Sequence, residues 1–290
     1  MHRLVRTAGG WLEVADKPSA EALAAYYNDK YYGAREDGRG QYTHAYTDEE
    51  LEHKRLGAAE AAAVWNGPPG RMLEVGFGEG FALDWFARAG WAVEGVDFTD
   101  DGLRAFFPEL ADRVRIGDAF ALLDQIVAAG QVYDLVICNN VVEHVLDPEG
   151  LLQRLRRIVA PGGLLRLAAP NDNSWLHQEV VARGMADPGF WIAVPDHLSY
   201  FDADTLPKAL ADNGWAVAEL LGEFPIELFL LNGDTAYTRD RTKGRGCHFA
   251  RVAFEVGLWK RRGIEAVIAF RRGCAASGTG RNLIAYARPA

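Results

Sequence analysis

The feature that most constrains the fold of this sequence is an alternation between short apolar runs and segments whose apolar residues recur at helical spacing. The apolar runs, each short enough for a strand, cover residues 71–75, 91–97, 112–118, 133–140, 164–170, 215–223 and 281–289. The helical segments between them cover residues 81–90, 100–110, 119–130, 147–163 and 202–215. This alternation predicts right-handed βαβ units around a mostly parallel sheet. In such α/β sheets, ligands bind beyond the carboxyl ends of the strands.

Three glycines stand where the first predicted strand becomes a helix. They are Gly76, Gly78 and Gly80 in the stretch LEVGFGEG. Glycines permit a tight turn with positive φ and let a ligand approach the backbone. A dinucleotide site would show the spacing G-x-G-x-x-G, whereas this stretch shows G-x-G-x-G with Glu74 two positions ahead. A carboxylate there is unfavourable beside a pyrophosphate and suits an amino group, which argues against an NAD-dependent oxidoreductase.

Two further acids follow the next two predicted strands. Asp97 ends the second strand and can accept hydrogen bonds from both hydroxyls of a ribose. Asp118 ends the third strand, beside Ala119 and Phe120, and can accept from an adenine amino group while its neighbours pack on the ring. One carboxylate for an amine, one for a ribose and one for a base together describe S-adenosylmethionine (SAM).

The stretches LEVGFGEG, VEGVD, IGDAF and YDLVICNNVVEHVLDPEGLLQRLRRIVAPGGLLRLAAPN resemble successive motifs of class I SAM-dependent methyltransferases. The resemblance covers roughly residues 71–221. It implies a seven-stranded, Rossmann-like α/β sheet whose last strand, here 281–289, is antiparallel and inserted next to the sixth. It also implies a cofactor site made of Glu74, Gly76, Gly78, Gly80, Asp97, Phe98, Asp118, Ala119 and Asn139.

Within that family, VVEHVLDP followed by PGGLL is most similar to the small-molecule O-methyltransferase branch, which includes enzymes of ubiquinone biosynthesis and of sugar and natural-product modification. In the ubiquinone-type enzymes the stretch reads E-x-x-E-H, and its acids and histidine are associated with a divalent metal. This chain has Asn140 in place of the first acid, before Glu143 and His144. The sequence therefore admits a divalent metal without favouring one.

A hydroxyl acceptor needs a base, and histidine has a suitable pKa. His144 follows the fourth strand, and His197 lies in the loop PDHLSYF at the same edge of the sheet, so these two are predicted to be catalytic. His177 lies on the same long connection as His197. The remaining histidines have less reason to lie near the site: His2, His44, His53 and His248.

The chain outside the motifs divides into predicted functional parts. Residues 1–66 form an N-terminal helical lid, 67–222 the SAM-binding core, 223–280 a cap insertion over the acceptor pocket, and 281–290 the final core strand. The lid contains a predicted helix that begins near Thr47, and Arg55 on this helix is a candidate for the cofactor's carboxylate.

Composition limits the partners of the protein. The chain has 290 residues and a net charge of −9, which argues against a general nucleic-acid binder. Its three cysteines lack metal-site spacing and favour a reduced, cytoplasmic compartment, and no run is long enough for a membrane span. The expected partner is a small-molecule acceptor, such as a hydroxyl of a sugar, a surface-polysaccharide unit or a natural product. Nitrogen or carbon methylation, a non-catalytic SAM-binding module and any oligomeric state stay open.

Overall fold

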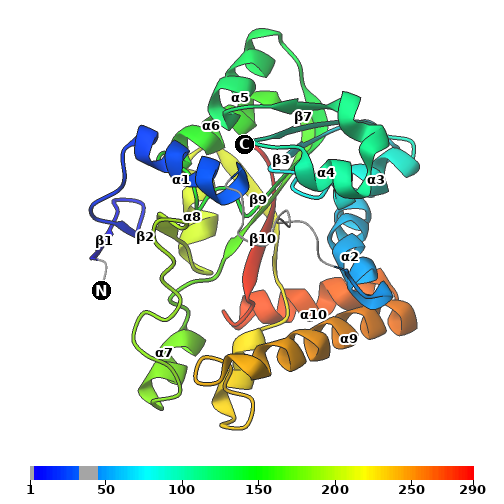
Figure 1. Ribbon diagram of the computed structural model, residues 1–290. Helices are drawn as coiled ribbons and strands as arrows, with labels where there is room; N and C mark the ends of the chain where they lie inside the picture. The colour runs from blue at the N-terminus through cyan, green and yellow to red at the C-terminus, as the bar shows by residue number, and fades with distance from the viewer. Residues whose placement is uncertain (1–2, 33–44) are drawn as a thin grey trace.

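The structure is a computed structural model that describes residues 3–32 and 45–290 (Figure 1). Its centre is a seven-stranded sheet with the order β5-β4-β3-β6-β7-β10-β9. The strands are β3 (Arg71–Val75), β4 (Ala92–Asp97), β5 (Val114–Ile116), β6 (Tyr133–Asn139), β7 (Val159–Pro170), β9 (Trp215–Gly222) and β10 (Asn282–Pro289).

The direction in which successive strands are added to the sheet reverses between β3 and β6. The chain runs outward from β3 to β4 and β5, then returns to place β6 on the other side of β3, and these neighbours pair in parallel. The carboxyl ends of β3 and β6 therefore border the switch point where α/β sheets bind ligands. β10 pairs antiparallel with both β7 and β9, so the predicted sheet with an antiparallel last strand is confirmed.

Helices cover both faces of the sheet because each helix carries one apolar stripe that must be buried. One face packs against α5 (Ala119–Ala128), α6 (Pro148–Ile158) and α8 (Thr205–Asp212). The other face packs against α2 (Asp48–Trp65), α3 (Phe81–Arg88) and α10 (Ile264–Ala276). The two helical layers hold the strand ends at a fixed edge, where the loops of the site are built.

The helix α2 begins at the predicted residue through a capping box. The Thr47 side chain accepts a hydrogen bond from the Glu50 backbone N–H, and the Glu50 carboxylate accepts from the Thr47 N–H in return. This reciprocal pair satisfies two backbone donors that the first turn of a helix leaves free. The helix ends at Trp65, and the C-cap residue Asn66 adopts a left-handed conformation with φ 47°.

The helix α6 is shorter than the sequence predicts. It ends at Ile158, and β7 begins at Val159, whereas the predicted helix extends to residue 163. Pro161 lacks a backbone N–H and disfavours a helical conformation at the residue before it. The apolar residues on both sides of the boundary therefore belong to two different elements.

The first residues form a small second sheet. In it β1 (Leu4–Arg6) and β2 (Leu12–Val14) pair with β8 (Ser199–Tyr200). Trp11, directly before β2, is buried in the main core, with its ring centroid 5.5 Å from that of Phe201.

The remaining elements are helical. After this sheet comes α1 (Ala20–Tyr32), and α4 (Asp101–Phe106) and the 3₁₀ helix η1 (Pro108–Arg113) follow β4. After β7 the chain forms α7 (Trp175–Ala182). The segment before β10 contains η2 (Ile226–Leu231), η3 (Arg241–Lys243) and α9 (Gly244–Arg262), which lies beside α10 and against α2 (Figure 1). No helix among the described residues is both long and apolar enough to cross a membrane.

Candidate functional site

The three glycines of the loop after β3 serve two different purposes. Gly76, Gly78 and Gly80 all have positive φ, at 75°, 53° and 78°. A Cβ on Gly76 would lie 2.5 Å from a Val141 methyl, and one on Gly80 would lie 2.2 Å from a Leu103 methyl. A Cβ on Gly78 would meet no atom within 4 Å. Gly76 and Gly80 therefore allow close packing, while Gly78 leaves its backbone open to a ligand.

Two cavities open at this edge of the sheet. The α1-side cavity, of about 520 Å³, lies between α1 and the loops after β3, β4 and β5. The α9-side cavity, of about 510 Å³, lies between α2, α9 and the ends of β3, β6 and β7. Gly76 and Asn140 line both cavities. Two compartments that share a border suit a reaction between two ligands.

The α1-side cavity contains four of the predicted cofactor residues beyond the glycines: Asp97, Phe98, Asp118 and Ala119. The Asp97 carboxylate accepts from the N–H groups of Gly78, at 2.8 Å, and Phe98, at 2.6 Å. Burial raises the pKa of Asp97, although these backbone donors oppose the shift. One oxygen of Asp118 accepts from the Ala121 N–H at 2.9 Å and so caps α5. Its position after a strand predicted a contact with adenine but not this helix cap.

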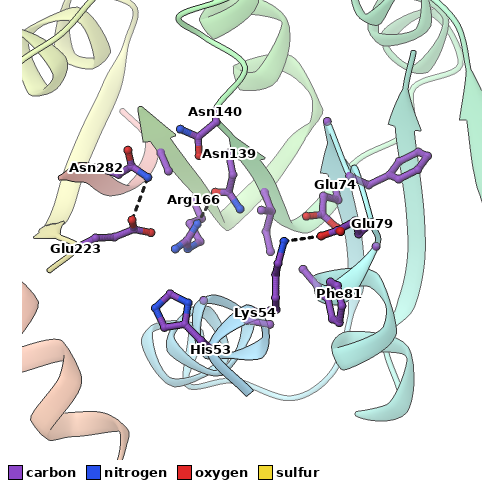
Figure 2. Close-up of a pocket in the computed structure, with 18 of the residues that line it drawn as sticks. His53, Lys54, Glu74, Glu79, Phe81, Asn139, Asn140, Arg166, Glu223 and Asn282 are labelled. Carbon is purple, nitrogen blue, oxygen red and sulfur yellow. Dashed lines mark hydrogen bonds and ion pairs between the residues drawn. The ribbon is translucent and has the colours of Figure 1, made fainter. Parts of the chain in front are cut away.

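Glu74 and Asn139 lie instead in the α9-side cavity (Figure 2). Gly80 also lines this cavity. Glu74 is only 6% exposed, and one of its carboxylate oxygens is buried without a hydrogen-bond partner. Burial, followed by repulsion from Asp97, raises the pKa of Glu74 to about 8. The Asn139 side-chain oxygen accepts from Arg166. One oxygen of Glu74 therefore lacks a partner among the described residues, and the raised pKa keeps this acid mostly protonated at neutral pH.

Arg55 is not among the residues that line either cavity, and its role stays a prediction. Its neighbour Lys54 does line the α9-side cavity and lies 2.5 Å from a Glu79 oxygen in the glycine loop. The Tyr46 hydroxyl donates to the other Glu79 oxygen at 2.6 Å. Glu50, Lys54 and Gly57 recur at helical spacing, so they share the face of α2 that lines the α9-side cavity. Arg55 does not lie on that face.

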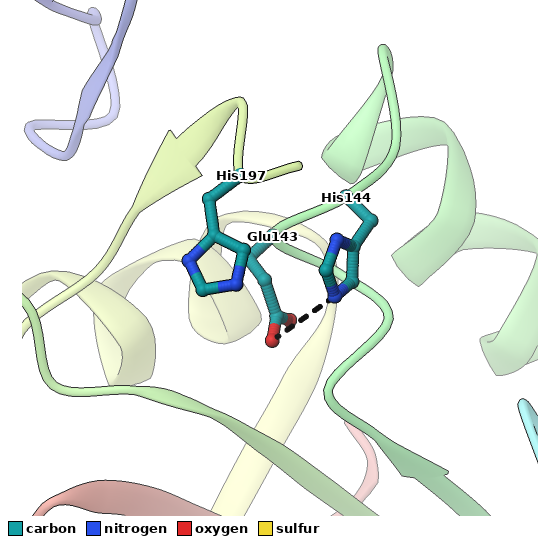
Figure 3. Close-up of side chains that lie close together, drawn as sticks. All are labelled: Glu143, His144 and His197. Atoms are coloured by element: carbon teal, nitrogen blue, oxygen red, sulfur yellow. Dashed lines mark ion pairs between the residues drawn. The ribbon is translucent and has the colours of Figure 1, made fainter. Parts of the chain in front are cut away.

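The predicted catalytic histidines lie together (Figure 3). The ring centroids of His144 and His197 are 4.9 Å apart, and an oxygen of buried Glu143 lies 3.7 Å from His144 Nε2. The Glu143 carbonyl accepts from the N–H groups of Leu198 and Ser199, which ties the two loops together. His144 lines the α1-side cavity, whereas His197 lines neither cavity.

The charges around these rings affect their protonation. Burial raises the pKa of Glu143 to about 7. Burial alone would lower the pKa of His197, but the carboxylates of Asp172, 3.8 Å from His197 Nδ1, and of Glu143 outweigh it and raise that pKa. The structure thus places a carboxyl group whose pKa is raised to about 7 beside an imidazole whose pKa is also raised, and perturbed pairs of this kind occur at proton-transfer sites.

The same three side chains could also hold a metal. Glu143, His144 and His197 each offer a ligand atom, and these atoms lie within 4.8 Å of one another. Two imidazoles and one carboxylate fit a transition metal better than Mg²⁺, which prefers oxygen ligands. These three side chains therefore fit a divalent ion. None of them replaces the first acid of the E-x-x-E-H pattern, where this chain has Asn140.

Other histidines also lie in the site. His53 and His248 line the α9-side cavity, contrary to the expectation from the sequence, and they contact Glu255 and Glu50 at 2.8 and 3.0 Å. Both contacts join residues about 200 positions apart, so no local motif could have signalled them. His2 and His44 fall outside the described residues.

The sheet has the strand order of class I SAM-dependent methyltransferases. Its glycine loop lies between Glu74 on β3 and Asp97 at the end of β4, as in that fold. Residues 8–220 match the family described as "Methyltransferase domain". The chain belongs to this family.

Individual proteins show the same similarity. The chain is 34% identical over 103 residues to a ubiquinone biosynthesis O-methyltransferase of Caulobacter sp. (strain K31), a match covering 35% of this chain and 41% of the relative. A Klebsiella pneumoniae (strain 342) protein of the same name is 29% identical over 150 residues, covering 48% of this chain and 62% of that protein. The chain thus spans about half the length of these curated relatives.

A solved structure resembles the whole chain. It is the 1,6-didemethyltoxoflavin-N1-methyltransferase of Burkholderia thailandensis, with bound 1,6-didemethyltoxoflavin and S-adenosylhomocysteine. The TM-score is 0.54 at 14% identity, over 99% of both chains. At this identity the likeness concerns the fold.

Proposed function

We propose that this protein is a SAM-dependent methyltransferase that transfers a methyl group to a small-molecule acceptor, namely a hydroxyl of a sugar, a surface-polysaccharide unit or a natural product. One observation carries the proposal. Two cavities of similar size meet at Gly76 and Asn140, and the open backbone of Gly78 and the acids Glu74 and Asp97 lie around that border. A donor that spans the border can present its methyl group to an acceptor in the second compartment.

The proposed donor position follows from the chemistry of the lining residues. Adenine would lie beside Asp118, Ala119 and Phe98, and the ribose hydroxyls would donate to Asp97. The methionine part would pass Gly78 and bring its amino group to Glu74, whose orphaned oxygen would gain a donor. A carboxylate next to an ammonium satisfies both groups, so cofactor binding would remove an unfavourable feature of the empty site.

The acceptor would occupy the α9-side cavity, which includes residues from the predicted cap insertion: Glu223, His248, Arg251, Val252 and Arg271. Methyl transfer is an in-line displacement at a sulfonium carbon. Orientation of the two reactants can supply much of the rate, because effective molarities of about 10⁵ M or more are reached when reacting atoms are held in line. The two-sided site would supply this orientation.

A hydroxyl acceptor must also lose a proton. Asn140, at the border of the two cavities, donates a hydrogen bond to Glu143, which lies beside both histidines. We propose that the acceptor hydroxyl reaches this border and that His144 or His197 removes its proton, with Glu143 stabilising the imidazolium that forms. A divalent ion held by Glu143, His144 and His197 is the alternative, since a bound metal lowers the pKa of a hydroxyl that contacts it. In either case these residues serve proton transfer, and the residues around Gly78 serve donor binding.

Calorimetry with SAM, S-adenosylhomocysteine (SAH) and NAD tests the donor site directly. We expect SAM and SAH to bind at micromolar affinity and NAD not to bind. A screen of hydroxylated, amino and activated-carbon acceptors with methyl-labelled SAM then tests the reaction. Binding of NAD without SAM would refute the proposal, label transfer only to nitrogen or carbon would redirect it, and SAH binding without any transfer would favour a non-catalytic module.

A further inference from the structure

We propose that the acceptor carries a carboxylate group and that Arg251 on α9 binds it. The inference rests on the proposed methyl transfer, because it names the chemical class that the α9-side cavity accepts. It starts from a comparison of the permanent cations that line this cavity: Lys54, Arg166, Arg251 and Arg271.

Two of the arginines are neutralised by buried carboxylates. Arg271 lies 2.7 Å from an oxygen of Glu60 and 2.6 Å from an oxygen of Glu255. Arg166 lies 3.3 Å from the other oxygen of Glu60. All four side chains are at most 4% exposed. Arg166 and Arg271 therefore stabilise the fold, and buried carboxylates already balance their charges.

The two remaining cations differ from each other. Lys54 is paired with Glu79 at 2.5 Å. Arg251 has no carboxylate within 4.0 Å anywhere in residues 3–32 and 45–290, and its Nε is buried without any hydrogen-bond partner. Arg251 is thus the one permanent cation of the described cavity lining whose charge is not balanced by a neighbouring acid.

Within the described part of the chain, Arg251 makes a single hydrogen bond, which holds its guanidinium in place. One terminal nitrogen donates to His248 Nδ1 at 3.2 Å. Because a guanidinium can only donate, Nδ1 must be the acceptor, and the proton of His248 must sit on Nε2, 3.0 Å from Glu50. Glu50 is itself fixed by the capping box of α2. A chain of three side chains therefore orients Arg251 from one side and leaves its other donors free.

The unpaired N–H donors of Arg251 indicate which chemical group the cavity binds. A buried donor without an acceptor costs the desolvation of that group. The Nε and terminal N–H groups of arginine form a planar fork that matches the two oxygens of a carboxylate. A carboxylate on the acceptor would satisfy the orphaned Nε and balance the charge in one contact, which a neutral acceptor cannot do.

The test uses matched pairs of an acid and its neutral counterpart: 3,4-dihydroxybenzoate with 3,4-dihydroxybenzamide, and galacturonate with galactose. Binding to the SAH-saturated protein is measured for wild type, Arg251→Gln and Arg251→Lys. Arg245→Met is the matched control, because Arg245 lies on the same helix but is exposed and packs over Phe249. Thermal unfolding of each variant shows that it is folded.

We expect wild type to bind the acid of at least one pair about 10- to 100-fold more tightly than its neutral partner, the range for a hydrogen bond to a charged group. Arg251→Gln should abolish that preference, Arg251→Lys should keep part of it, and Arg245→Met should keep it all. SAH affinity should be unchanged in all three variants.

Three results would overturn the inference. The first is no preference for the acid in any pair, whether both members bind or neither does. The second is a preference that survives in Arg251→Gln. The third is a loss of SAH affinity in Arg251→Gln, which would mean that Arg251 binds the carboxylate of the cofactor. Failure of wild type to bind SAH is a separate result that removes the proposed function itself.

Discussion

The two cavities differ in how far along the chain their contacts reach. In the α1-side cavity, Asp97 accepts from Gly78 and Phe98, which lie 19 positions and one position away. Behind the α9-side cavity, the lining residues Arg166 and Arg271 and the buried Tyr286 all meet at Glu60 across 106 to 226 positions. The first cavity is built by neighbouring loops of one sheet edge, and the second by charges that meet only when distant elements pack. A short sequence motif can specify a site built from nearby residues. A site built from distant residues depends on how the surrounding elements pack.

The physical cost of the two sites also differs. The α1-side carboxylates use backbone N–H groups that the loops must satisfy in any case. The α9-side network buries two arginines and two glutamates, and desolvation of such ions offsets much of their attraction. We therefore expect substitutions in the two regions to affect different observables: binding and turnover for the first, stability and acceptor choice for the second.

The largest expected effect concerns turnover beside the α1-side cavity. His144→Ala or His197→Ala should lower kcat by about 10²–10⁴-fold, the usual contribution of a general base, and leave SAH affinity nearly unchanged. His177→Ala is the matched control, since His177 lies on α7 and contacts Glu227 instead. The measurement is single-turnover transfer from labelled SAM to an acceptor found by screening.

A chelator separates the two routes for the proton. EDTA should have little effect on wild type if an imidazole acts directly. If EDTA abolishes activity and Mn²⁺ or Zn²⁺ restores it, Glu143, His144 and His197 serve as metal ligands. If neither histidine matters and EDTA has no effect, the acceptor needs no base, and a nitrogen or an already acidic hydroxyl becomes the better acceptor.

The next effect concerns stability on the α9 side. Glu60→Ala should lower the free energy of unfolding by about 3–5 kcal/mol, because it leaves two buried guanidinium groups without their shared partner. Lys208→Ala, which removes an exposed pair with Asp212 on α8, should change it by less than about 1 kcal/mol. Urea denaturation measures both. Equal effects of the two substitutions would show that the network does not hold α2 and α10 on the sheet.

A smaller effect is expected for donor binding. Asp97→Ala should weaken SAH binding by about 1.5–3 kcal/mol, because it removes a charged acceptor of hydrogen bonds. Asp97→Asn keeps an oxygen for the Gly78 N–H and should lose less. Glu223→Gln, on the α9 side, should leave SAH affinity unchanged. Calorimetry provides these values, and an unaltered affinity in Asp97→Ala would mean that the ribose lies elsewhere.

The smallest effect is a proton released on donor binding. The pKa of Glu74 is raised to about 8, so this acid is protonated in the empty site at pH 7. An ammonium group beside it favours the carboxylate and lowers that pKa. SAH binding at pH 7 should then release up to about one proton, measured by calorimetry in buffers of different ionisation enthalpy.

The control for this release is Glu74→Gln, which has no proton to lose. The release should also vanish above about pH 9, where Glu74 is already ionised in the empty site. Release that persists in Glu74→Gln would assign the proton to another group, and the amino end of the donor would then have to be sought away from Glu74.

Much of the donor side was predictable from the sequence. The period of two in the strands, the period of 3.6 in the helices and the short connections define the order of elements, and parallel strands bring their carboxyl ends to one edge. Residues that follow successive strands, such as Gly78, Asp97 and Asp118, must then lie near one another. The proximity of His144 and His197 followed from the same rule.

Other features required the packed structure. Only the tertiary structure shows that His53 and His248 enter the site, that Lys54 rather than Arg55 faces the cavity, and that Arg251 is left without an acid. The end of α6 at Ile158 also differs from the predicted end at residue 163, because apolar residues continue across the boundary into the next strand.

The sequence by itself determined the sheet, the glycine loop and the position of the strand-end acids, because backbone geometry and short-range sterics govern each of them. The tertiary structure decided which charges neutralise one another around the α9-side cavity. Glu60, Arg166 and Arg271 carry no local signal of their pairing, since an ion pair depends on the distance between side chains and not on their separation in sequence. The acceptor end of the site therefore emerged only when α2, α9 and α10 were packed against the sheet.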